Sequence, residues 1–331
     1  MSSLAPEPRL LDKLRHKIRL KGYSPATEKN YAYWAKRYII YHGKRHPSGM
    51  GLPEIEAFLS HLVSSEGASA STQNQALSAL LFLYKSVLGQ SIDGAVDAIR
   101  AKRYDYIPTV LSVEEVRRLL GKLEGMRRLM AELTYGAGLR ISETHRLRVQ
   151  DLDFACRRIL VRDGKGRKDR FTLLPTSLVE PLQRHLLHVR SLHAADIARG
   201  YGASVMPRAA ARRLPYVSKD FIWQFVFPSS ALFHDRRTGL SGRWHVNKST
   251  LQKAIQRAAR QAGISKRVST HALRHSFATH LLQNGCDIRR IQLLLGHTHI
   301  NTTMIYAHIV DAHRLNVVSP LDMRPDSMAH A

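Results

Sequence analysis

Residues 270–306, THALRHSFATHLLQNGCDIRRIQLLLGHTHINTTMIY, decide the fold of this chain. Apolar residues at helical spacing predict a first helix that places His271, Arg274 and His275 on neighbouring faces. The opposite stripe of this helix is apolar and is predicted to be buried. The stretch therefore begins with a packed helix that carries a group of basic side chains.

Two further helices are predicted in the same stretch. Asp287 caps one of them and Gly296 ends it, which places His297 just beyond its C-terminus. An Asn or Thr cap then starts a short helix in which Tyr306 lies one turn from the start. Each feature is common on its own, but the combination of the three indicates a possible catalytic site.

Two upstream segments add basic residues to this group. In TYGAGLRISETHRLR, residues 134–148, Arg140 precedes a predicted helix that contains Glu143. Taken alone, Arg140 could be an ordinary surface residue that forms an ion pair with Glu143. In RRILVRDGKGRKDRFTLLP, residues 157–175, apolar and polar residues alternate on both sides of a Gly-Lys-Gly turn. This pattern predicts a β-hairpin with Lys165 at its tip.

A metal site is not indicated. The spacing of His271 and His275 suits zinc, but no HExxH glutamate and no third ligand at suitable spacing accompany them. Cys156 and Cys286 are too few for a disulfide framework and lack the spacing of a zinc ribbon. We expect no metal or cofactor, and both cysteines reduced and buried.

Composition favours a polyanionic partner. The 331 residues hold 51 Lys and Arg against 26 Asp and Glu, a net charge of +25. An apolar fraction of 44% and a charged fraction of 23% describe a folded protein rather than a solvated basic tail. Nucleic acid is therefore the leading partner class, ahead of an anionic membrane surface.

Residues 1–100 are predicted to form a helical N-terminal domain. Residues 10–90 contain four segments with helical periodicity, and their start signals are Ser24 for the second, Pro53 for the third and Ser71 or Thr72 for the fourth. The second helix is rich in aromatic and basic residues that could contact DNA. Spacing within it favours a core role for Tyr31, Trp34 and Tyr38.

Residues 101–111 are predicted to be a linker, and residues 112–331 a second domain. Ser112 and Glu115 make a capping box, which marks a new helix start. Residues 109–331 hold 36 Lys and Arg against 17 Asp and Glu, so most of the positive charge lies there. An insert at about 190–247 has little periodicity and is expected to be irregular and functional.

No membrane segment is predicted. The N-terminus lacks a continuous apolar region, and the most apolar stretch, residues 76–84, is too short to span a bilayer. We expect a cytoplasmic protein of the bacterial nucleoid.

Taken together, the motifs resemble the tyrosine recombinase (phage integrase) family. They are Arg140 in GLR, Lys165 in the hairpin, HxLRH, LLGH, and Tyr306 nine residues after His297. The resemblance implies a mainly α-helical protein with a small β-sheet or hairpin. It further implies a four-helix, SAM-like core-binding domain joined to an α+β catalytic domain. More narrowly, WQFVFPS, GRWH and the helix LQKAIQRAARQAGI resemble the integron integrases, which capture gene cassettes by joining attachment sites.

The resemblance assigns roles that suit the chemistry of each residue. Breaking a phosphodiester without metal requires a nucleophile, donors for the non-bridging oxygens and an acid for the departing 5′ oxygen. Tyr306 is the expected nucleophile, and it forms a 3′-phosphotyrosyl link as in type IB enzymes. Arg140 and Arg274 are expected to clamp the phosphate, His297 to donate a further hydrogen bond, and Lys165 to be the acid.

Other residues are expected to assist. Lys168 is the alternative acid. His271 is expected to support the phosphate or to accept the tyrosine proton, and Glu143 and His275 to organise the neighbouring basic groups. Because the link stores the energy of the phosphodiester, a 5′ hydroxyl can reverse the step without ATP, and the sequence has no P-loop motif.

The resemblance to integron integrases also implies a partner. Those enzymes bind folded single-stranded sites with unpaired bases, besides duplex DNA. Trp223, Pro228, Trp244 and His245 offer surfaces for stacking such bases, although Trp244 stands where the family usually has a histidine. Arginines of the insert are expected to hold flanking phosphates: Arg212, Arg213, Arg236, Arg237 and Arg243.

The expected assembly is a homotetramer on DNA. Three alternative functions stay open. The chain could be a Xer-like or phage-type recombinase on duplex sites, with the insert as a protein contact. It could be a DNA-binding regulator with a dead active site, although no expected Tyr or Arg is missing. It could also be a type IB topoisomerase, which shares the chemistry and needs no partner site.

Overall fold

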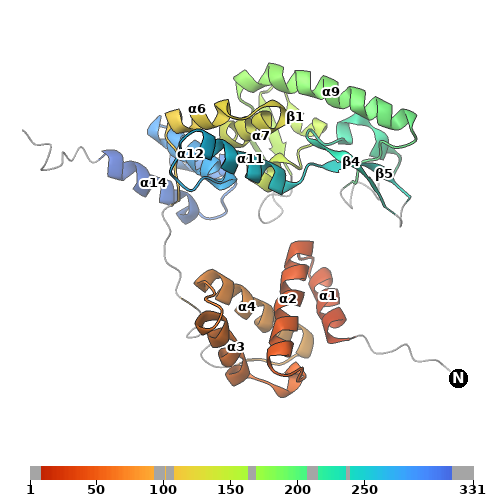
Figure 1. Ribbon diagram of the computed structural model, residues 1–331, viewed down its shortest axis with the longest axis vertical. Helices are drawn as coiled ribbons and strands as arrows, with labels where there is room; N and C mark the ends of the chain where they lie inside the picture. Colours follow the sequence, from red (N-terminus) through yellow and green to blue (C-terminus); the bar gives the residue numbers. More distant parts are fainter. Residues whose placement is uncertain are drawn as a thin grey trace, which may run out of the picture. The chain divides into compact units, whose positions relative to one another are not determined.

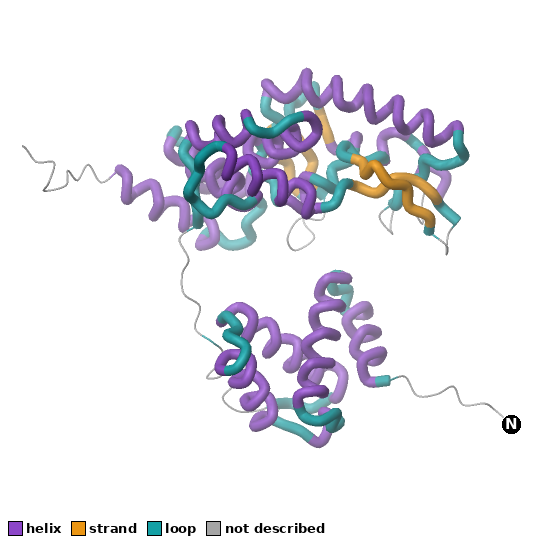
Figure 2. Tube along the Cα trace, viewed as in Figure 1, coloured by secondary structure: helices purple, strands orange, loops and turns teal. Residues whose placement is uncertain are grey.

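The computed structural model describes residues 9–92, 101, 108–162, 169–206, 215–235 and 239–314. The chain divides into two compact units, residues 1–106 and 107–331. Helices make up most of both units, and the described strands lie in the second one (Figure 2). The prediction of a mainly helical fold with a small β component is confirmed.

Residues 9–92 of the first unit contain four α-helices followed by a π-helical turn, and the helices are labelled in Figure 1. Serine caps set two of the starts: Ser24 Oγ accepts the Thr27 N–H at 3.1 Å, and Ser69 Oγ accepts the Thr72 N–H at 3.3 Å. The fourth helix therefore begins after Ser69, and the expected cap at Ser71 or Thr72 was wrong. The elements are α1 (Leu10–Leu20), α2 (Pro25–Tyr41), η1 (Pro47–Gly49), α3 (Leu52–Ser64), α4 (Ala70–Phe82) and η2 (Leu83–Leu88).

Aromatic side chains fill the core of the first unit. Trp34 and Tyr38 of α2 are buried, and the Tyr38 hydroxyl pairs with that of Tyr84 at 2.8 Å. Tyr31 is partly buried against Phe82, with ring centroids 5.4 Å apart. The core interpretation of these α2 residues is confirmed by their burial. Large aromatic rings remove much apolar surface from water and so contribute strongly to the stability of a core.

The second unit is built on helices whose ends match the sequence signals. The Ser112 hydroxyl and the Glu115 carboxylate cap each other's backbone N–H groups at 3.2 and 2.7 Å, as the capping box predicts. Asp287 accepts two N–H groups at the start of its helix, and Gly296 ends that helix with a φ of 64°. The helices are α6 (Val113–Gly121), α7 (Gly125–Gly136), α8 (Ile141–Thr144), α9 (Val179–Ala198), α11 (Lys248–Gln261), α12 (Thr270–Gln283), α13 (Ile288–Leu295) and α14 (Asn301–Arg314). The helix that carries Tyr306 has 14 residues and is not short.

A three-stranded antiparallel sheet lies beside these helices. Its strands are β1 (Leu152–Asp153), β2 (Arg158–Val161) and β3 (Arg170–Leu173), in that order, and Ile159 pairs with Thr172. The strands of the predicted hairpin are thus present. Lys165 and Lys168 of its turn lie outside the described residues. Short 3-10 helices complete the unit: η3 (Val149–Asp151), η4 (Thr176–Leu178), η5 (Pro215–Lys219) and η6 (Phe221–Trp223).

The insert is more regular than its sequence suggests. Its first residues continue α9 to Ala198, and its end forms a second antiparallel pair, β4 (Pro228–His234) with β5 (Ser241–His245). Gly242 permits this arrangement, because a Cβ there would lie 1.8 Å from the Ala203 carbonyl oxygen. The expectation of an irregular segment was wrong for these parts.

The cysteine and membrane expectations have different outcomes. Both cysteines are free, but Cys156 is exposed in the turn between β1 and β2 and Cys286 is half-buried, so the expected burial was wrong. Among the described residues, no helix has the length and apolar character needed to cross a membrane.

Candidate active site

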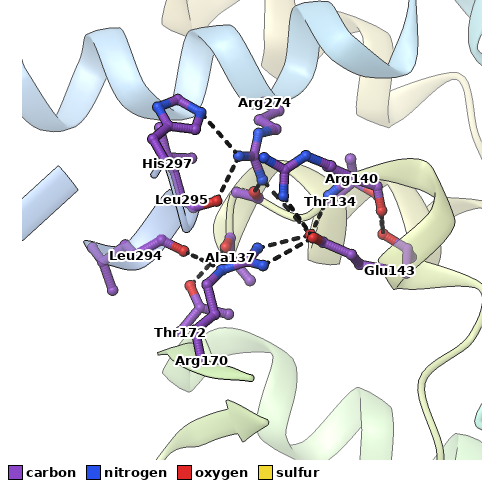
Figure 3. A network of polar contacts seen from close by, with 12 residues as sticks. Thr134, Ala137, Arg140, Glu143, Arg170, Thr172, Arg274, Leu294, Leu295 and His297 are labelled. Atoms are coloured by element: carbon purple, nitrogen blue, oxygen red, sulfur yellow. Dashed lines mark hydrogen bonds and ion pairs between the residues drawn. The ribbon is translucent and has the colours of Figure 1, made fainter. Parts of the chain in front are cut away.

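Three arginines surround one buried carboxylate, Glu143 (Figure 3). Arg140 donates its backbone N–H and a guanidinium N–H to this carboxylate, both at 2.8 Å. Arg170 makes two parallel hydrogen bonds to it at 2.8 and 2.7 Å, and Arg274 lies 3.7 Å away. Glu143 therefore holds two predicted phosphate-binding arginines in one place.

Arg170 was missed by the sequence reasoning. Its Nε donates to the Leu294 carbonyl at 2.8 Å, which joins β3 to α13. A signal for it exists in the strand pattern, because Arg170 and the buried Thr172 share one face of β3. A charged residue on the inward face of a strand requires a buried partner, and Glu143 is that partner.

The charge of Glu143 leads to a prediction about pH. Burial raises the pKa of this carboxyl, but the hydrogen bonds and charge of Arg170 outweigh burial and lower the pKa to about 2, against an ordinary 4.5. The paired carboxylate therefore stabilises the fold fully above about pH 4.5. This contribution falls with the pH between 4.5 and 2. We expect the stability gap between the wild type and Glu143→Gln to narrow by about 1 kcal/mol from pH 7 to about pH 3.5, measured by urea unfolding. A gap that does not change with pH would contradict the assignment.

Arg274 is fixed by backbone carbonyls around its buried guanidinium. It donates to Gly138 at 2.6 Å and to Leu295 at 2.7 Å, and His297 Nε2 lies 3.2 Å from its Nη2. Gly138 has a φ of 61°, and a Cβ there would lie 2.4 Å from the Phe277 ring. Burial lowers the pKa of Arg274 to about 9, so the guanidinium stays charged at neutral pH.

Tyr306 lies on α14 and packs against α12. Its side chain is only 1% exposed, and its hydroxyl is 2.9 Å from Nδ1 of His275. The His297 ring stacks on the Tyr306 ring, with centroids 6.4 Å apart, and its Nδ1 pairs with Thr303 Oγ1 at 2.9 Å. Burial raises the pKa of Tyr306, and Arg274 and Arg140 partly oppose the rise.

His271 is the residue that the resemblance leads us to expect as a support for the phosphate or as an acceptor of the tyrosine proton. It is exposed at the start of α12, and its ring centroid is 6.5 Å from that of His275. Among the described residues, the histidine that contacts the Tyr306 hydroxyl is His275. In the described ranges, no cluster of three or more His, Cys, Asp or Glu side chains could hold a metal ion.

The residues predicted for base stacking lie around β4 and β5. Trp244 is 42% exposed, and its ring lies 5.9 Å from Phe225 and 6.0 Å from Phe233. Pro228 pairs with His245 across the two strands. These contacts form an aromatic cluster with Trp244 at the surface.

Trp223 lies deeper and is half-buried. The buried guanidinium of Arg148 stacks over its ring at 5.8 Å and over Phe225 at 4.5 Å. Arg148 also donates to Ser204 Oγ at 2.8 Å and to the Val205 carbonyl at 2.6 Å. Trp223 therefore helps to anchor the insert to the rest of the second unit.

Arg243, which is expected to hold a flanking phosphate, is engaged within the protein. Its guanidinium forms a largely buried ion pair with Asp196 of α9 at 2.6 Å and donates to the Ser229 and Ser230 carbonyls. The side chain is committed to holding β4 and β5 on α9. Four other arginines named for phosphates lie outside the described residues: Arg212, Arg213, Arg236 and Arg237.

One pocket joins the arginine cluster to the insert. It has a volume of about 560 Å³, and its lining includes Arg140, Arg146, Phe225, Trp244 and His245. Positive charge and aromatic rings thus line the same pocket, a combination suited to a phosphate with an adjacent base.

Comparison with known proteins identifies the family. The sequence pattern of the Phage integrase family matches residues 109–313, and that of the Phage integrase N-terminal SAM-like domain matches residues 10–93. The chain belongs to the phage integrase family. Its fold and the Xer relatives below make it a tyrosine site-specific recombinase that acts on DNA.

The similarity to known relatives and solved structures extends over most of the recombinase chain. An integrase/recombinase of Escherichia coli is 44% identical over 96% of this chain and 94% of its own length. Tyrosine recombinase XerD of Agrobacterium fabrum is 33% identical over 78% of this chain and 76% of its own. XerH bound to its palindromic difH substrate shares the fold, with a TM-score of 0.61, 23% identity and coverage of 93% and 83%. A lambda integrase dimer bound to a COC′ core site gives a TM-score of 0.59, 18% identity and coverage of 90% and 93%.

Proposed function

We propose that this recombinase integrates and excises integron gene cassettes, with Tyr306 as the nucleophile of a 3′-phosphotyrosyl intermediate. The phenolic oxygen attacks the phosphorus, and the bond from phosphorus to the 5′ oxygen breaks. A 5′ hydroxyl from another strand then attacks the link and releases the tyrosine, so no cofactor is consumed.

The arginines offset the charge that develops on the phosphate. Arg140 and Arg274 lie around Glu143, which presents two guanidinium groups to one anion. His297 Nε2 accepts from the Arg274 guanidinium at 3.2 Å. We propose that His297 donates a further hydrogen bond to the phosphate once the phosphate, in place of His297, accepts from Arg274. Lys165 is proposed as the acid that protonates the departing 5′ oxygen.

The pocket between Arg140 and Trp244 supports the proposal for folded single-stranded sites. Its aromatic wall would receive a base that projects from a hairpin stem, while the arginines hold the adjacent backbone. A perfectly paired duplex has no unpaired base to place there. Exchange between two sites would use four protomers on DNA.

We expect Trp244→Ala to reduce the preference for a bulged single-stranded hairpin over its perfectly paired duplex by about tenfold, because one stacked base contributes about 1–3 kcal/mol. The measurement is DNA binding at matched salt with both substrates. Phe171→Ala is the matched control, since Phe171 is an exposed aromatic residue on the other sheet.

The binding comparison and two further experiments separate the proposal from its alternatives. Equal affinity of the wild type for the two substrates would favour a Xer-like or phage-type recombinase on duplex sites. Relaxation of plasmids that lack any attachment site would favour topoisomerase activity. Absence of any covalent adduct on a suicide site would favour a regulator.

A further inference from the structure

The Tyr306 hydroxyl is enclosed by groups from two packed helices, α12 and α14. Tyr306 is 1% exposed, so bulk water has little access to its proton. A tyrosine that attacks phosphorus must lose that proton, and a positioned side chain has to accept it. His275 Nδ1, at 2.9 Å, is within the range for direct proton transfer.

The neighbouring histidines are placed for other tasks. His271 is exposed one turn earlier on α12. Both ring nitrogens of His297 are engaged, Nε2 with the Arg274 guanidinium and Nδ1 with Thr303. His297 is therefore oriented toward the phosphate-binding arginine and not toward the tyrosine proton.

We propose that His275 is the catalytic base that takes the proton from Tyr306. This inference rests on the proposed nucleophilic role of Tyr306. The hydroxyl donates to Nδ1, so the neutral ring carries its own proton on Nε2. As the oxygen–phosphorus bond forms, the phenolic proton moves to Nδ1, and the bond from phosphorus to the 5′ oxygen breaks. The imidazolium returns the proton to the tyrosine when the 5′ hydroxyl of the partner strand reverses the step.

Charges around His275 make the transfer depend on bound DNA. In the protein alone, burial, His271 and Arg274 lower the pKa of His275 to about 4, which keeps its nitrogen unprotonated. A phosphodiester held by Arg274 offsets the arginine charge and brings a negative charge close to the ring. Both effects raise the affinity of His275 for a proton. Tyr306 therefore stays protonated until the scissile phosphate is in place.

The test compares His275→Asn with His271→Asn. The asparagine side chain can keep a polar atom near Tyr306 but cannot take up the proton. The probe is a nicked suicide DNA site, selected from a randomised pool by covalent capture with the wild-type protein. The rate of adduct formation is measured from pH 6 to 9, together with DNA affinity. A second probe carries sulfur in place of the 5′ bridging oxygen, because a sulfur leaving group needs no acid.

We expect His275→Asn to slow adduct formation by about 10²- to 10⁴-fold with little change in DNA affinity. Its rate should rise about tenfold per pH unit, since deprotonation then depends on hydroxide. The sulfur probe should rescue Lys165→Ala but not His275→Asn. His271→Asn should keep the ordinary oxygen-probe pH profile.

Several outcomes would overturn this assignment. They are a wild-type rate in His275→Asn, a defect that is equal at every pH, or rescue of His275→Asn by the sulfur probe. A slow His271→Asn with the steep pH profile would move the role to His271. If the wild type forms no adduct at all, the proposed function itself fails, and that result is distinct from each of these.

Discussion

Tyr306→Phe is expected to abolish the covalent protein–DNA adduct and all strand exchange, while DNA affinity changes by less than about threefold. The substitution removes one oxygen atom, which is the atom that would form the ester, and no other described residue could replace it at that position. Within the described residues, the Tyr306 hydroxyl has one hydrogen bond, to His275 Nδ1, so its loss should cost only about 1 kcal/mol of stability. The measurement is a denaturation-resistant adduct on a suicide site, resolved by gel electrophoresis.

Tyr135→Phe provides a matched control in the same unit. The Tyr135 hydroxyl also contacts a histidine nitrogen on α12, His280 Nδ1, at 2.8 Å. The two substitutions therefore remove the same chemical group from equivalent hydrogen bonds. Adduct formation should persist in Tyr135→Phe, and an adduct in Tyr306→Phe would rule out Tyr306 as the nucleophile.

Arg170→Met is expected to lower the rate of adduct formation by about 10²- to 10³-fold and to destabilise the fold by about 3 kcal/mol. The substitution removes the two parallel hydrogen bonds that fix Glu143, although Arg170 itself is not assigned to the phosphate. Glu143 would then turn toward Arg140 and Arg274 and compete with the phosphate for them. Thermal unfolding and single-turnover cleavage of a suicide site measure the two effects.

Two variants check the cause of this loss. Arg158→Met is the control variant. Arg158 lies on the adjacent strand β2, and the substitution removes an exposed ion pair with Asp153, so the free energy of unfolding should fall by less than about 1 kcal/mol. The double variant Arg170→Met with Glu143→Gln removes the unpaired charge and should recover part of the stability. A double variant whose destabilisation equals the sum of the two single changes would show that Arg170 acts by packing and not through Glu143.

Local signals predicted most of the helical framework. The capping box at Ser112, the cap at Asp287 and the stop at Gly296 depend on residues within a few positions, so the sequence is enough to identify them. The insert was harder to predict, because the pairing of β4 with β5 and their attachment to α9 depend on Arg243 reaching Asp196 across 47 positions.

The sequence by itself determined the fold class, the two-domain character and most of the candidate residues for recombination chemistry. Residue type and order carry that information, since a guanidinium, an imidazole and a phenol have fixed chemical capacities wherever they lie. Only the tertiary structure decided which groups meet. It placed Arg170 on Glu143 and His275 on Tyr306, because contacts between β3, α8, α12 and α14 join residues far apart in the chain. Spacing in a sequence cannot specify such distances.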